Sequence, residues 1–167
     1  CLLVNRLFLP EIDEYRHEAW DIIKRCPQHT FQILTKRPER IMECLPEDWG
    51  AGYENVWLVT SVGSNKGIHK IEEIADVPAK HLFISFEPLH GPINIQNLPM
   101  GCFSWAIIGG ESGNETGPYG YRPCQLDWIR ELKNKCQVYG LKVFVKQLGT
   151  HLSKEMGLKD RHGTNID

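Results

Sequence analysis

The stretch TFQILTKRPERIMEC, residues 30–44, decides the fold class. Residues 30–34 form a short run rich in β-branched and aromatic side chains, which predicts a strand. Polar residues follow at once, and Pro38 then begins a helical pattern at a first-turn position, where its missing N–H costs nothing. A strand that passes through a short polar exit into a helix is half of a βαβ unit.

The same unit recurs along the chain. Further apolar runs of this kind occupy residues 1–8, 55–62, 81–86, 104–108 and 141–145, the first being the weakest. Helical patterns lie between the runs, at residues 13–25, 38–44, 66–74 and 125–139. Near-continuous apolar runs are typical of parallel strands buried on both faces. We therefore expect one α/β domain over residues 1–167, either a doubly wound sheet or a barrel.

The composition excludes several classes of protein. The 167 residues carry 19 Lys and Arg against 21 Asp and Glu, so the formal net charge is -2. This balance disfavours extensive electrostatic binding to nucleic acid, although a local basic patch stays open. No apolar run approaches the roughly 20 residues of a membrane span, and the first ten residues do not resemble a signal peptide. We expect no membrane partner.

The six cysteines are scattered, at positions Cys1, Cys26, Cys44, Cys102, Cys124 and Cys136. No two of them have the two-residue spacing of a zinc or cluster motif, so they predict free thiols in a reducing compartment and a cytoplasmic protein. The seven histidines form no HExxH or i, i+4 pair, and no protein metal site is predicted. The chain also has no catalytic-serine elbow.

Charged, polar and glycine residues follow nearly every apolar run. They are Thr35, Lys36, Arg37, Glu87, Gly109, Gly110, Glu111, Ser112, Lys146 and Gln147, with Arg122 in a later loop. Ligands of parallel α/β folds bind at the carboxyl ends of the strands, where these residues would meet. Both signs of charge are present, so a zwitterionic or phosphate-bearing ligand would find complementary groups there.

Each of these groups also has a plainer interpretation. Lys36 with Glu87, or Lys146 with Glu111, could form ion pairs that need no ligand. The GGESG segment at 109–113 could be a turn with a solvated carboxylate, because it matches neither a dinucleotide fingerprint nor a P-loop. Arg122 could equally be an anion clamp or a solvated loop residue.

Several motifs together resemble one family. They are PQHTFQILTKRPERI (27–41), ISFEPLHGPI (84–93), WAIIGGESG (105–113), RP-x3-DW (122–128), CQVYGLKVFVKQLG (136–149) and KDRHG (159–163). From about residue 11 to its end the chain resembles the phage and prophage family named after phage gene products thirty-seven and sixty-eight, a domain of unknown function. The resemblance implies a TIM-like (β/α) barrel of the radical-SAM type.

The resemblance also implies a cofactor that this chain cannot hold alone. Full-length members carry an N-terminal three-cysteine motif, which implies a [4Fe-4S] cluster and S-adenosylmethionine. This chain lacks that motif, and the single Cys1 cannot replace three thiolates. We therefore expect no cofactor within it. The sequence begins with Cys and ends without a terminating signal, so we expect a fragment, the later part of an incomplete barrel.

These exit residues match the motifs of the family, and the roles that we infer for them divide them into two groups. Glu87 and Glu111 would hold an amine or transfer protons, and Lys146 would bind carboxylate or phosphate; these three are the candidate catalytic residues. The candidate ligand-binding residues are Thr35, Lys36, Arg37, Gly109, Gly110, Ser112, Arg122 and Gln147. At the exit after residues 55–62 the chain departs from the family, because Val62, Gly63 and Ser64 replace an expected acidic residue.

Two functions stay open at this point. The first is a radical-SAM-like enzyme that acts on a small molecule or a nucleobase. The second is a non-catalytic barrel domain that binds a ligand or a protein without a cluster; a truncated reading frame without a role is a third. An incomplete barrel exposes strand edges, which predicts self-association or a partner protein.

Overall fold

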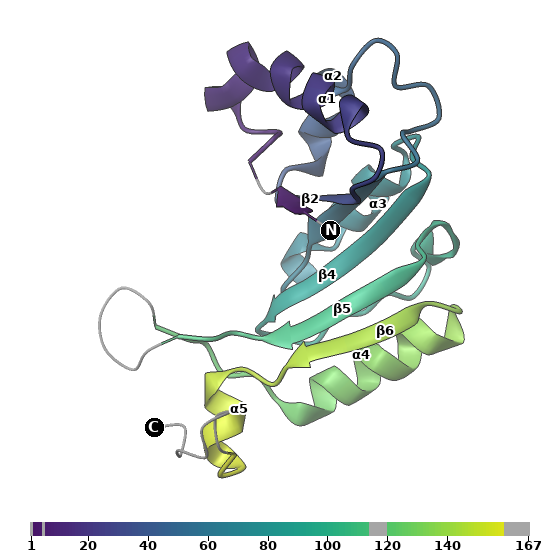
Figure 1. The fold of residues 1–167 in the computed structure, drawn as a ribbon. Coiled ribbons are helices and arrows are strands. Elements are labelled where there is room, and N and C mark those ends of the chain that lie inside the picture. The colour runs from purple at the N-terminus through teal and green to yellow at the C-terminus, as the bar shows by residue number, and fades with distance from the viewer. Residues whose placement is uncertain (1, 5, 114–119, 159–167) are drawn as a thin grey trace.

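The computed structural model describes residues 2–4, 6–113 and 120–158. Within them, six parallel strands form one sheet (Figure 1). The strands are β1 (Leu2–Val4), β2 (Phe31–Thr35), β3 (Val56–Ser61), β4 (His81–Leu89), β5 (Trp105–Gly110) and β6 (Lys142–Gln147). Each strand pairs in parallel with the next one along the chain. The expected strands are therefore all present.

Helices connect the strands. They are α1 (Arg16–Arg25), α2 (Ile41–Cys44), α3 (His69–Ala75), α4 (Leu126–Val138) and α5 (Thr150–Glu155). Short 3-10 turns lie at Pro10–Tyr15, Pro38–Arg40, Asn65–Gly67 and Met100–Cys102. The predicted α/β class is confirmed, because strands and helices alternate. The sequence did not predict α5, which is too short to show a helical period.

One face of the sheet packs against the helices. Alternate strand residues such as Ile33, Leu58 and Ile84 are fully buried there, in one hydrophobic core with side chains from α1 to α4. Burial of this apolar surface is the main favourable contribution to folding. Figure 1 shows α4 lying along β6 on this side of the sheet.

The other face carries a cluster of aromatic rings near the amino ends of the central strands. The ring centroids of Trp57 and His81 are 4.9 Å apart, and those of Phe83 and Trp105 are 4.7 Å apart. These residues alternate along the strands with the helix-facing core residues, so they lie on the opposite side of the sheet. The central strands β3, β4 and β5 are thus largely buried on both faces, as the unbroken apolar runs predicted. The prediction fails for β2, where buried and half-buried residues alternate, and for β6, which is mostly exposed.

The strand order follows the chain order without a reversal. A doubly wound sheet changes direction at a switch point, and the described strands contain none. The sheet is open, because β1 and β6 do not pair with each other in the described residues. In the same part of the chain, no helix combines the length and the apolar character that crossing a membrane requires.

Candidate functional site

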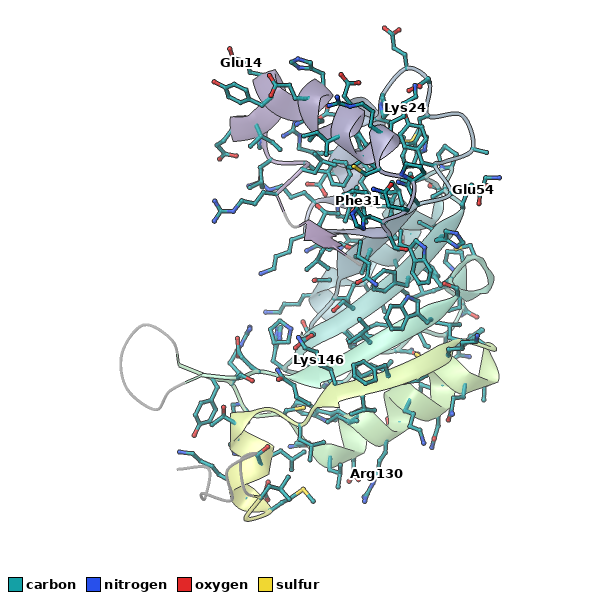
Figure 2. The ribbon with its side chains drawn as sticks, in the orientation of Figure 1. Glu14, Lys24, Phe31, Glu54, Arg130 and Lys146 are labelled. Carbon is teal, nitrogen blue, oxygen red and sulfur yellow. The ribbon has the colours of Figure 1, made fainter. Side chains whose placement is uncertain are left out.

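The carboxyl ends of the strands meet at one edge of the sheet, since all of them are parallel. Figure 1 shows the arrowheads of β4, β5 and β6 pointing to the same side. Figure 2 places Lys146 at this edge and Glu54 at the opposite one. Residues from the ends of β4, β5 and β6 converge here, and we refer to them as the exit cluster: Glu87, Gly109, Gly110, Lys146 and Gln147.

Glu87 is the centre of the exit cluster. Lys146 Nζ lies 3.0 and 3.1 Å from its two carboxylate oxygens, and Gln147 Nε2 donates a hydrogen bond to Oε1 at 3.0 Å. Gln147 Nε2 also donates to the carbonyl oxygen of Gly110 at 2.9 Å, which fixes its amide group. The Glu87 side chain is only 18% exposed, whereas that of Lys146 is 52% exposed. A carboxylate is therefore held in place while the ammonium group reaches solvent.

Two local features orient the Glu87 side chain toward Lys146 and Gln147. The pairing register shifts between Phe86 and Leu89 and again between Ile108 and Gly109, and such irregularities redirect side chains at strand ends. Gly109 then provides space, because a Cβ on it would lie 3.1 Å from Glu87 Cδ and Oε1. A Cβ at position 109 would therefore push the Glu87 side chain away by a few tenths of an ångström.

A second ion pair lies farther along the β5 exit. Arg122 binds Glu111 through three donors: its backbone N–H and Nε reach Oε2 at 2.8 and 2.7 Å, and Nη2 reaches Oε1 at 2.8 Å. The hydrogen bonds from Arg122 hold the pKa of the Glu111 carboxyl below its usual range, and the same pair raises the pKa of Arg122. Glu111 is neither solvated nor paired with Lys146, the two plainer alternatives that the sequence had left open.

The structure separates the remaining predicted residues from this cluster. Thr35 is 6% exposed and its Oγ1 accepts a hydrogen bond from the Arg37 backbone N–H at 2.9 Å. Thr35, Lys36 and Arg37 line a separate pocket of about 460 Å³ at the β2 exit. Residues of the 6–9 segment line the same pocket. The exit of β3 lies between the two groups. Ser112 is exposed beside Glu111.

The sequence analysis missed one residue at this edge, His90. Its Nδ1 lies 2.9 Å from the carbonyl oxygen of Pro88, and its backbone N–H donates to the carbonyl oxygen of Gly63 at 3.0 Å. A signal was present, because the histidine follows Glu87 by three residues, just beyond the apolar run at 81–86. Metal-ligand spacings do not detect a single imidazole.

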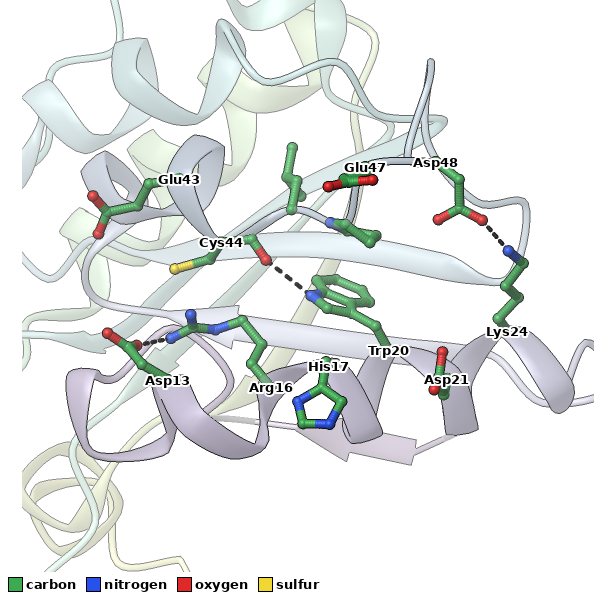
Figure 3. Close-up of a pocket in the computed structure, with 12 residues that line it drawn as sticks. Asp13, Arg16, His17, Trp20, Asp21, Lys24, Glu43, Cys44, Glu47 and Asp48 are labelled. Carbon is green, nitrogen blue, oxygen red and sulfur yellow. Dashed lines mark hydrogen bonds and ion pairs between the residues drawn. The ribbon is translucent and has the colours of Figure 1, made fainter.

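Another pocket lies away from the strand exits. Figure 3 shows this cavity of about 560 Å³, which is lined by residues of α1, residues 43–48 and Asp13. Four of its charged side chains form two pairs, Arg16 with Asp13 and Lys24 with Asp48, and Trp20 Nε1 donates to the carbonyl oxygen of Cys44 at 2.9 Å. These contacts join α1 to the following segment, so we interpret the pocket as structural.

The sequence of the chain matches one family description, "Protein of unknown function (DUF5131)", over residues 4–167. The chain belongs to the DUF5131 family. The match covers nearly all of the chain, and it includes the exit cluster and His90. No curated protein and no solved structure gives a significant match.

The described part of this DUF5131 chain does not fit an iron–sulfur cluster. Such a cluster needs three thiolates at one cube, and no group of three His, Cys, Asp or Glu side chains among the described residues could hold a metal ion. Cys44, Cys124 and Cys136 are buried in the core instead. We therefore derive no chemical step through a cluster.

Proposed function

We propose that this chain is the ligand-facing part of a radical-SAM-like enzyme, and that it binds a small molecule or a nucleobase at the carboxyl ends of β4, β5 and β6. The observation that supports this most is the exit cluster. Glu87 is held by Gln147 and faces the half-exposed Lys146, so an acceptor and a donor stand side by side. A ligand with an ammonium and a carboxylate group would match both.

The same proposal includes the barrel. Six parallel strands in chain order, with their helices packed into one core, form the arrangement of consecutive strands in a (β/α) barrel. Active sites of that fold lie at the carboxyl ends of the strands. The exit cluster occupies this position.

The residues of the exit cluster would act on a ligand in distinct ways. A ligand amine would donate to Glu87 and displace Lys146, because the carboxylate has two oxygens and Gln147 occupies only one. The released Lys146 ammonium would then bind a ligand carboxylate or phosphate. The backbone of Gly109 and Gly110 lets a ligand approach closely.

A non-catalytic binding domain is the second candidate. In its favour, two cations beside the exits of β4, β5 and β6 already have a carboxylate partner, Lys146 with Glu87 and Arg122 with Glu111. An edge whose charges are matched in this way is stable without a ligand, and it would suit a domain that docks onto another protein.

The test is an NMR titration of the ¹⁵N-labelled chain with three probes. S-adenosylhomocysteine carries an amine, a carboxylate and an adenine, whereas methionine and adenosine each carry one part. We expect S-adenosylhomocysteine to shift the backbone amides of residues 109–113 and 146–149, and each smaller probe to shift fewer of them. A folded chain whose amides respond to none of the probes would refute the proposal and favour the protein-binding alternative.

Matched variants locate the binding. E87Q and K146M each remove one charge-assisted contact, which weakens binding by about tenfold. The control variants E54Q and K80M break a similar ion pair, 3.2 Å long, at the opposite edge of the sheet, and should leave the affinity unchanged. Equal losses in both sets would show that the binding does not occur at the exit cluster.

A further inference from the structure

The exit of β3 carries no charged side chain, because Val62, Gly63 and Ser64 follow the strand. The structure shows what fills this space. A Cβ added to Gly63 would lie 2.4 Å from Cε1 and 2.6 Å from Nδ1 of the His90 imidazole. It would also lie 2.4 Å from the carbonyl oxygen of Pro88. The imidazole therefore occupies the space that any side chain at position 63 would need.

The orientation of this ring is fixed by its contact with the backbone. A carbonyl oxygen can only accept, so the 2.9 Å contact between Nδ1 and Pro88 requires the hydrogen on Nδ1. In the neutral ring, Nε2 then carries a lone pair and is an acceptor. Nε2 has no hydrogen-bond partner among the residues that the structure describes, and the side chain is half-buried.

The ring stands at the same edge of the sheet as the proposed site, because His90 directly follows Leu89, the last residue of β4. Glu87 precedes it by three residues at the end of β4. The imidazole thus lies just beyond the end of β4, the strand between β3 and β5.

We propose that His90 is a ligand-contacting acceptor and a specificity determinant of this site, and that Gly63 is the residue that makes room for it. The imidazole supplies an acceptor beside an exit at which residues 62–64 carry no charged side chain. The inference rests on the proposed function and narrows the ligand to one that presents an N–H or O–H donor, such as an amine or the exocyclic amino group of a nucleobase, to Nε2.

The first test needs no ligand. Long-range ¹H–¹⁵N spectra of the histidine rings, with His90 assigned by its loss in H90Q, report which nitrogen carries the hydrogen. We expect His90 to show the neutral tautomer protonated at Nδ1. A ring protonated at Nε2, or one that averages over both tautomers, would overturn the inference.

Two glycine variants test the role of position 63. In G63A the new methyl group must displace the ring, so the Nδ1-protonated signature of His90 should be lost. G67A is the matched control, because its Cβ would meet only Val62 Cγ1 at an ordinary 3.7 Å, and it should keep the signature. An unchanged His90 signal in a folded G63A would show that the ring does not need this space, and H90Q and H90L carry the test if G63A does not fold.

The third test separates this inference from the proposed function. S-adenosylhomocysteine is titrated into the wild type, H90L, which has no acceptor, and H90Q, whose amide oxygen can accept. We expect about a tenfold weaker affinity for H90L and a partial recovery for H90Q. If H90L binds as well as the wild type, the proposed site stands and the role of His90 is wrong. If the wild type itself binds none of the probes, the proposed function is refuted. The proposed contact between His90 and the ligand is then refuted as well.

Discussion

Gly110 at the end of β5 lies directly against the backbone of Leu148 and Gly149 after β6. A Cβ on Gly110 would be 2.2 Å from the carbonyl oxygen of Leu148, and a Cβ on Gly149 would be 2.8 Å from the carbonyl carbon of Gly110. The backbone N–H of Thr150 donates to the carbonyl oxygen of Glu111 at 2.9 Å beside this contact. The exits of β5 and β6 are thus joined backbone to backbone, which brings Gln147 within reach of Glu87.

The first prediction concerns this contact. G110A should destabilise the chain by about 1–3 kcal/mol, because the inserted methyl group must push two backbone segments apart. The measurement is the free energy of unfolding in urea. G101A is the control, since a Cβ there would meet no atom within 4 Å. Equal stabilities of the two variants would show that the exits are not in tight contact.

The second prediction concerns the pair of Glu87 and Lys146. A double-mutant cycle of E87Q and K146M, measured by the free energy of unfolding, should give a coupling energy of about 1 kcal/mol. The reason is that the Glu87 carboxylate is largely buried and held by Gln147. The cycle of E54Q and K80M is the reference, and that exposed pair should couple by about 0.3 kcal/mol or less. A larger coupling at the reference pair would contradict the account of the exit cluster.

The third prediction uses the low pKa of Glu111. A carboxyl group whose pKa is lowered in the folded state stabilises the fold above its ordinary pKa, and this contribution is lost as the pH falls through the lowered value. R122M should therefore be less stable than the wild type at pH 7 by about 1 kcal/mol. The difference should shrink as the pH falls below 4.5, the ordinary value for this group.

Urea unfolding of both proteins between pH 7 and pH 3 checks this prediction. R130M is the control, because Arg130 is exposed. Its one hydrogen bond to Asp127 among the described residues runs from Nη1 to Oδ1 and is 3.5 Å long. A stability difference between R122M and the wild type that stays constant across this range would show that Glu111 is not the group responsible.

The fourth prediction concerns β6, which pairs only with β5 among the described residues. Phe144 is 52% exposed on this edge strand. Unpaired strand edges with apolar side chains promote association, so we expect the chain to self-associate as its concentration rises, and F144K to reduce this. Sedimentation velocity measures the association. V138K removes an apolar residue that is 85% exposed on α4, and an equal effect of V138K would exclude the strand edge as the cause.

The sequence predicted the strands well because each buried strand needs an unbroken apolar run. The run at 55–62 became β3 at Val56–Ser61, and the run at 141–145 became β6, shifted by two residues at its end. The 13–25 helix was less accurate, since its first turns are a 3-10 segment and α1 begins at Arg16. Tight turns and α-helices share the same apolar spacing over a few residues, so the pattern cannot separate them.

The candidate site was predicted as a set of residues but not as a set of contacts. Strand exits can be read from the sequence, and Glu87, Lys146 and Gln147 do meet at one edge. The sequence had offered Lys36 with Glu87 and Lys146 with Glu111 as pairs. The register shifts at the ends of β4 and β5 produced a different pairing. A shift of this kind depends on how two strands fit, which neither strand encodes alone.

The sequence by itself determined the α/β class, the positions of the strands and the chemistry available at their ends, because apolar periodicity and residue type are local properties. Only the tertiary structure decided that neighbouring strands in the sheet follow the order of the chain. It also decided that Thr35 lines a pocket at the β2 exit whereas Glu87 belongs to the exit cluster, and that the His90 ring fills the space next to Gly63. These relationships join residues that are distant in the chain, and they arise from backbone packing between neighbouring strands.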